Sequence, residues 1–80
     1  MKIRFYGRLS ELIGREIDLD AAESISVGDL FQRLAQAHAD AASALLNPRV
    51  RAVVADEIVP RDFILDPGED LEILPIVSGG

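Results

Sequence analysis

The stretch Leu-Glu-Ile-Leu-Pro-Ile-Val-Ser-Gly-Gly, residues 71–80, decides how the rest of the chain is interpreted. Its first residues alternate apolar and acidic side chains, which is typical of a strand with one buried face. Pro75 has no backbone N–H, so it predicts the end of the strand ladder and the start of a tail over residues 75–80. Gly79 and Gly80 have no side chains to pack and lose the most backbone entropy when ordered. They therefore favour a flexible Gly-Gly tail that fits a narrow site over a structural role.

The composition limits the protein to one small domain and excludes several classes of function. A chain of 80 residues is enough for a single domain, 1–80, with a modest core. It has no cysteine, so disulfides, thiolate metal sites and thiol nucleophiles are excluded. The net charge of −6 and the few aromatic residues argue against a nucleic acid partner, and a basic protein surface is the more natural one.

The sequence also shows none of the usual targeting or ligand-binding motifs. No apolar run approaches the length of a membrane span, and none resembles a signal peptide, so we expect a cytoplasmic protein without a membrane partner. No metal-binding or phosphate-loop motif is present, and we expect no metal site. His38, the only histidine, has no carboxylate-and-nucleophile pattern around it and is interpreted as an ordinary helix-end residue.

Periodicity predicts one main helix and four to five short strands. Ser26, with Asp29 three residues later, is a typical helix start, and the apolar period of 3.6 then continues over residues 27–38. A looser helical segment is expected over residues 39–46, before Asn47-Pro48. The strands are expected at residues 2–6, 16–20, 50–55, 58–60 and 71–74, with turns at residues 56–57 and 66–70 and a further short apolar run at 63–65. One helix cannot bury its apolar stripe alone, so an α+β fold with one sheet packed on the helix follows.

Four parts of the chain together resemble the small subunit of molybdopterin synthase (MoaD). They are the Ile-x-Phe opening, Ser-Val-Gly-Asp-Leu at 26–30, Asp-Pro-Gly-Glu-Asp at 66–70 and Leu-Pro-Ile-Val-Ser-Gly-Gly at 74–80. The resemblance spans the whole chain. Ile76 stands where the family usually has a second proline, and Ala55 where it often has an asparagine. The resemblance implies a ubiquitin-like β-grasp domain, with the last strand central and parallel to the first, that carries sulfur on its terminal carboxylate.

The same resemblance implies the chemistry and the partners. The carboxylate of Gly80 would be adenylated by a separate ATP-dependent activating enzyme (MoeB-like), and a sulfur donor would then replace AMP to leave a thiocarboxylate. The chain would bind no cofactor permanently and would not be an enzyme alone. A larger catalytic subunit (MoaE-like) would accept the tail in a heterotetramer. There the sulfur would pass to cyclic pyranopterin monophosphate and form the dithiolene of molybdopterin, a step in molybdenum cofactor biosynthesis.

The predicted site residues lie at the end of the chain. Gly80 carries the reactive group, and Gly79 gives clearance in a narrow channel because a β-carbon would widen the chain there. Ser78 is small enough to follow them, although a solvated hydroxyl without a role explains it equally well.

The apolar residues just before the tail predict a surface for partner binding. Strand alternation puts Leu74 on the opposite face from its neighbours or at the end of the strand, and an exposed apolar cluster beside a functional tail indicates docking. The alternative is that Leu74 covers the core. The predicted docking residues are Leu74, Pro75, Ile76 and Val77.

Two other functions are compatible with the same sequence. One is a related carrier, either a sulfur carrier of the thiamine-pathway type or a ubiquitin-related protein modifier whose tail ends in an isopeptide bond. The other is a β-grasp interaction module with no chemistry at the tail. The proline-containing approach to the tail favours the molybdopterin carrier over the first, and the terminal Gly-Gly argues against the second.

Overall fold

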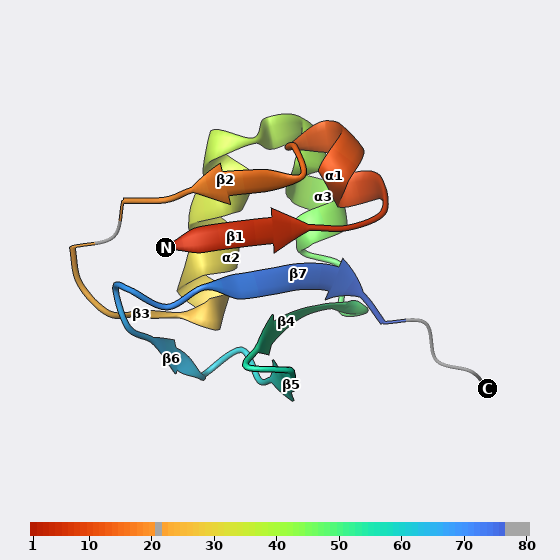
Figure 1. Ribbon diagram of the computed structural model, residues 1–80. Helices are drawn as coiled ribbons and strands as arrows, with labels where there is room; N and C mark the ends of the chain where they lie inside the picture. The colour runs from red at the N-terminus through yellow and green to blue at the C-terminus, as the bar shows by residue number, and fades with distance from the viewer. Residues whose placement is uncertain (21, 77–80) are drawn as a thin grey trace.

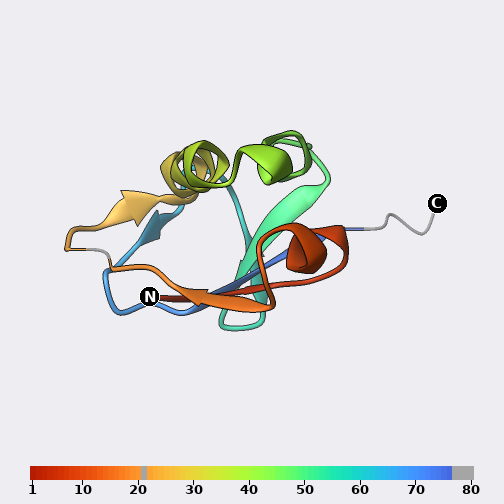
Figure 2. The same cartoon turned by 90° about the horizontal axis from the view of Figure 1, so that it is seen from above.

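The computed structural model describes residues 1–20 and 22–76, which form two layers. Figure 1 looks onto the sheet with the helices behind it, and Figure 2 shows the helices packed along one face of that sheet. The sheet order is β2-β1-β7-β4-β5. The strands are β1 (Lys2–Phe5), β2 (Glu16–Asp18), β4 (Val50–Val54), β5 (Glu57–Val59) and β7 (Leu71–Pro75). The helical elements are α1 (Arg8–Leu12), α2 (Val27–Ala37), η1 (Ala39–Ala41) and α3 (Ala42–Leu45).

The last strand, β7, occupies the centre of the sheet. It runs parallel to β1, with Phe5 opposite Ile73, and antiparallel to β4, with Ala52 opposite Ile73. β1 pairs with β2 as the short connection between them predicts, in antiparallel orientation. A mixed five-stranded sheet with its last strand between the first and a later one, packed on one main helix, is the ubiquitin-like β-grasp fold. The predicted fold class is confirmed.

The core lies between the sheet and α2. The helix begins as predicted, because the Ser26 side chain accepts a hydrogen bond of 3.1 Å from the amide of Asp29. It ends at Ala37, with His38 as the C-cap residue, and the looser segment that follows is η1 and then α3. The inward residues of α2 and of the central strands form one buried cluster that includes Val27, Leu30, Phe31, Leu34, Ile3, Phe5, Ala52, Leu71 and Ile73.

Two details of the strands differ from the prediction. Ile25–Ser26 (β3) and Ile64–Leu65 (β6) pair in a second, two-stranded sheet; β3 was not expected, because two residues are too few to show alternation. The hairpin between β4 and β5 turns at Ala55 and Asp56, one residue earlier than predicted. Both residues have positive φ, 50° and 67°, and a two-residue turn of this kind matches the twist of the strands that it joins.

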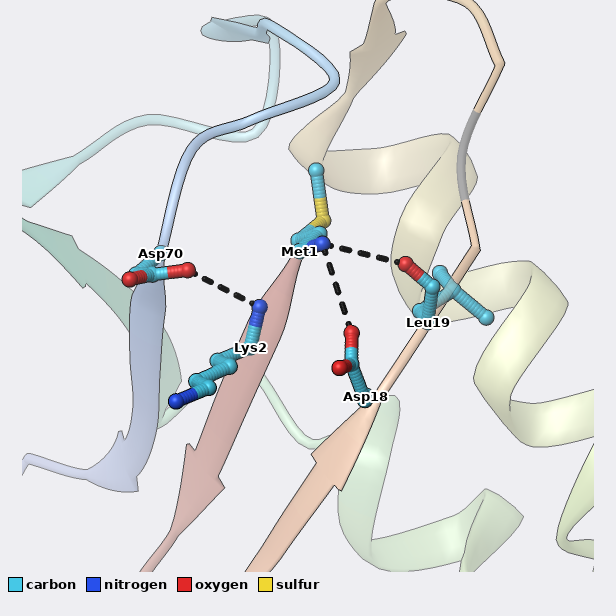
Figure 3. A network of polar contacts seen from close by, with 5 residues as sticks. All are labelled: Met1, Lys2, Asp18, Leu19 and Asp70. Atoms are coloured by element: carbon cyan, nitrogen blue, oxygen red, sulfur yellow. Dashed lines mark hydrogen bonds and ion pairs between the residues drawn. The ribbon is translucent and has the colours of Figure 1, made fainter.

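Polar contacts fix the start of β1 at one end of the sheet (Figure 3). The amino group of Met1 donates a hydrogen bond of 3.2 Å to the carbonyl oxygen of Leu19 and lies 3.6 Å from the carboxylate of Asp18. On the other side, the amide of Lys2 donates to the carboxylate of Asp70 at 3.0 Å. These contacts hold β1 between β2 and β7 at the end of the sheet where β7 begins.

In the part of the chain that the structure describes, the longest helix has 11 residues, and none has the length and apolar character needed to cross a membrane.

Candidate functional site

The central strand β7 leads directly to the predicted functional tail. Pro75 is still paired with Val50 of β4, and the amide of Ile76 donates a hydrogen bond of 2.8 Å to the carbonyl oxygen of Arg49. The predicted start of the tail at Pro75 is therefore wrong, because contact with the sheet persists through Ile76. The reason is that proline removes only its own N–H, and the next amide still reaches the neighbouring strand.

The residues expected to carry the chemistry follow this strand. Val77, Ser78, Gly79 and Gly80 lie outside the described residues, so their predicted roles stay predictions. The structure shows which strand precedes these residues. β7 is the central strand of the sheet and has hydrogen-bonded neighbours on both sides (Figure 1), so the last described residues before the tail are held by the sheet.

A tight turn from β1 into α1 supports the end of β7. Gly7 has φ of 62°, in the region that favours glycine, and a β-carbon built there would lie 3.8 Å from the ring of Pro75. The hydroxyl of Ser10 donates to the carbonyl oxygen of Gly7 at 2.6 Å, which holds the turn in place. The turn therefore lies beside the ring of Pro75, at ordinary van der Waals distance.

The face of the sheet opposite the helices, here called the outer face, carries partly exposed apolar side chains on β4, β5 and β7. Leu74 is half-buried on this face because its neighbour Ile73 points into the core. Val53 of β4 lies diagonally from Leu74 and directly opposite Ile58 of β5, which is 51% exposed. Leu74, Val53 and Ile58 form an apolar strip across three strands, of which sequence reasoning named only Leu74.

The outer face also carries charged side chains, and those around Arg4 contact one another. The guanidinium of Arg4 lies between Glu16 of β2, at 3.5 Å, and the register position of Glu72 on β7. The hydroxyl of Tyr6 donates to the carboxylate of Glu72. The phenol of Tyr6 and then the carboxylate of Glu16 raise the pKa of the Arg4 guanidinium above its usual value. These groups are exposed to solvent, so their pairing contributes little stability and mainly shapes the surface charge.

The described residues, 1–20 and 22–76, contain no buried polar or charged side chain and no group of three or more His, Cys, Asp or Glu placed to hold a metal ion. His38 lies at the end of α2, as the sequence predicts.

Comparison with known proteins gives the family. The model of the ThiS family matches residues 3–80. The chain belongs to the ThiS family. Its fold is that of the ubiquitin-like sulfur carriers of the ThiS and MoaD type, a small domain that is not itself catalytic, and it is shared with ubiquitin-like modifiers. Carriers of this type work in general with adenylating and catalytic enzymes. No curated protein sequence matches the chain.

Solved structures agree with this fold. SAMP1 from Haloferax volcanii is 24% identical, covers 99% of this chain and 97% of its own, and superposes with a TM-score of 0.79. A protein from Pyrococcus furiosus described as molybdopterin converting factor, subunit 1, is 20% identical over 95% of each chain, with a TM-score of 0.76. The Haloferax volcanii HVO 2177 protein is 23% identical, covers 99% of this chain and 84% of its own, and has a TM-score of 0.65.

One residue that supports the tail in this ThiS-family chain was missed by sequence reasoning. The guanidinium of Arg61 lies over the ring of Phe31, 4.8 Å from its centroid, and donates to the carbonyl oxygens of Asn47 and Val50 at 3.3 and 3.2 Å. It therefore braces the turn that contains Arg49, the residue that holds Ile76. Nothing in the sequence marks it, since an arginine after a proline in a loop has no distinctive pattern.

Proposed function

We propose that this protein is a sulfur carrier that acts as the small subunit of molybdopterin synthase. The match of the ThiS family over residues 3–80, which includes the Gly-Gly sequence that follows the central strand, supports the carrier part of the proposal. In this proposal Gly80 is the last residue of the working protein, and its carboxylate is the group that carries sulfur.

The chemistry begins with an unreactive group. An α-carboxylate has a pKa of about 3.3–3.7, so it is ionised at neutral pH and is a poor electrophile. The activating enzyme binds ATP and transfers AMP to the Gly80 carboxylate, which releases pyrophosphate. A sulfur donor then displaces AMP and leaves a thiocarboxylate. Each transfer of sulfur to cyclic pyranopterin monophosphate returns Gly80 as a carboxylate, and two transfers complete the dithiolene of molybdopterin.

The other residues of the site have supporting roles. Gly79 and Ser78 pass through the channel of the large subunit, where longer side chains would block the way. Leu74, Pro75 and Ile76, together with Val77, contact that subunit, and the apolar strip on the outer face extends the same docking surface. The large subunit supplies the catalytic residues.

Two observations bear on the pathway. The sequence resemblance and the likeness to the Pyrococcus furiosus protein described as molybdopterin converting factor, subunit 1, support the molybdopterin pathway. The likeness to SAMP1, also described as small archaeal modifier protein 1, favours a second candidate. In that function the activated carboxylate of Gly80 forms an isopeptide bond with a lysine of another protein.

Deleting Gly80 tests the proposal. The shortened chain ends in the carboxylate of Gly79, which is chemically similar but withdrawn by one residue, about 3.3–3.6 Å of extended chain. Reacting atoms must approach to about 3–3.5 Å, so the reach is lost while the core is unchanged. We expect the deletion variant to keep its thermal midpoint and to fail in dithiolene formation with the activating enzyme, ATP, sulfide, the pterin precursor and the large subunit.

The variant Ser78→Ala is the matched control, because it changes the tail without changing its length; we expect it to support dithiolene formation. A deletion variant that delivers sulfur at the parental rate would contradict the carrier function. Recovery of the intact protein in isopeptide linkage to lysines of cellular proteins, after purification under denaturing conditions, would favour the modifier.

A further inference from the structure

A hollow of about 180 Å³ opens beside the end of β7. Its apolar wall includes Leu9 of α1, Val50 of β4 and Pro75 of β7, and Arg8 and Arg49 also line it. This exit hollow lies between the end of the sheet and the short helices α1 and α3. It is distinct from the apolar strip, which lies on the outer face.

The exit hollow is fixed to the base of the tail. The amide of Arg49 donates to the side-chain oxygen of Asn47 at 2.9 Å, and its carbonyl oxygen accepts the hydrogen bond of 2.8 Å from Ile76. The guanidinium of Arg61 braces the same turn through Asn47 and Val50. The backbone of Arg49 is therefore held on both sides. A partner that pairs with the guanidinium has to order only the Arg49 side chain, so the entropy cost of binding is small.

The charges of this acidic protein are distributed unevenly along the sheet. Four arginines lie around the end where β1 and β7 finish and β2 and β4 begin: Arg8, Arg15, Arg49 and Arg51. They outnumber the acidic residues at this end, which are Glu11 of α1, Glu16 at the start of β2 and Asp40 of η1. The opposite end carries Asp18, Asp20, Asp56, Glu57, Glu69 and Asp70, with Lys2 at the start of β1 as a basic neighbour.

The arginines of the exit hollow are available for a partner. Within the described ranges 1–20 and 22–76, neither Arg8 nor Arg49 forms an ion pair, whereas Arg4 on the outer face is paired with Glu16. A chain of net charge −6 that gathers unpaired arginines around one apolar hollow has a surface complementary to carboxylates there.

Because the tail is short, an enzyme that acts on Gly80 must bind next to this hollow. The four residues after Ile76 span at most about 14 Å when fully extended. An enzyme that acts on Gly80 must therefore bring its surface within that distance of the end of β7, where Pro75 forms part of the wall of the hollow.

We propose that the exit hollow receives an apolar side chain of the ATP-dependent adenylating enzyme, bordered by carboxylates that pair with Arg8 and Arg49. This inference rests on the proposed function and names the chemistry of the surface that the enzyme presents. The apolar contact excludes water beside the two charge pairs, and the arginines orient the carrier so that its tail faces the enzyme.

The test is the pyrophosphate exchange catalysed by the purified adenylating enzyme from the same genome, with this chain as the acceptor. The double variant Arg8→Glu with Arg49→Glu should raise the KM for the carrier about tenfold at low salt and leave kcat unchanged. The difference should shrink as salt is added, because screening weakens exposed charge pairs. A purely structural defect would lower the thermal midpoint and would not depend on salt in this way.

The matched control makes the same change of net charge on another part of the surface. Lys2 and Arg33 are exposed, lie on β1 and α2, and do not line the exit hollow, so Lys2→Glu with Arg33→Glu should leave the KM within about twofold of the parent. A third variant, Ala44→Phe, fills the hollow from α3 without a change of charge. It should raise the KM by a factor that does not vary with salt.

The outcomes separate the two hypotheses. A parental KM for the Arg8 and Arg49 double variant, or a rise no larger than that of the control, would overturn the docking inference and leave the carrier function intact. A parent chain that supports no pyrophosphate exchange would overturn the proposed function, and the docking inference with it.

Discussion

Leu34 on α2 provides the most direct test of the core. Its side chain is 1% exposed and belongs to the buried cluster between α2 and the sheet. We predict that Leu34→Ala destabilises the domain strongly, because the helix has only one apolar face with which to hold the sheet.

The magnitude follows from the atoms removed. The substitution deletes three carbon atoms, which at about 0.8 kcal/mol each gives a transfer term of about 2.4 kcal/mol. The unfilled cavity adds to this, within the range of about 2–5 kcal/mol for buried leucines. A domain of 80 residues has a total free energy of unfolding of about 4–12 kcal/mol. The loss is therefore a large fraction of the total, and at about 4–8 °C per kcal/mol the thermal midpoint should fall by at least about 10 °C.

The assay is thermal or urea denaturation followed by circular dichroism, with Ile64→Ala as the matched control. Ile64 on β6 is 56% exposed, so its truncation should cost less than about 1 kcal/mol. A midpoint of Leu34→Ala that equals that of the parent would refute the position of this residue in the core. Equal losses for the two variants would refute the reasoning from burial.

Two further predictions concern the surface and the hairpin. Leu74→Glu should leave the domain folded, because Leu74 lies on the outer face and is only half-buried, and should weaken binding to the large subunit about tenfold or more, because an apolar contact is replaced by a carboxylate that loses its water. Titration calorimetry measures the affinity, and an unchanged value would indicate that Leu74 covers the core and does not contact the large subunit. Ala55→Asn should stabilise the domain by about 0.5–1 kcal/mol, because asparagine tolerates the φ of 50° at this position better than alanine does; a lower denaturation midpoint would contradict that account of the turn.

Local patterns were enough to predict most of the fold. The alternation around Leu71 and Ile73 predicts which residues of β7 face the core, and Ser26 with Asp29 predicts the start of α2 to the residue. These signals depend on neighbours in the sequence, through side-chain periodicity and a local hydrogen bond. The central position of β7, in contrast, came from the resemblance to a known fold.

The features that were missed depend on contacts between distant segments. Ile25–Ser26 becomes a strand only because it meets Ile64–Leu65, and Arg61 has a role only because Phe31 and the turn at Asn47 lie beside it. The same reason explains the start of the tail, since the hydrogen bond between Ile76 and Arg49 joins segments that the sequence does not place together.

The mass of the intact chain tests the central claim most directly. The purified protein is incubated with the adenylating enzyme, ATP and sulfide, with a parallel sample that lacks ATP. The account predicts that the full-length chain gains the mass difference between a sulfur and an oxygen atom in the complete mixture only, and that fragmentation places the change on Gly80. A chain that stays a free carboxylic acid in the complete mixture, with an adenylating enzyme that is active on another carrier, would contradict the account.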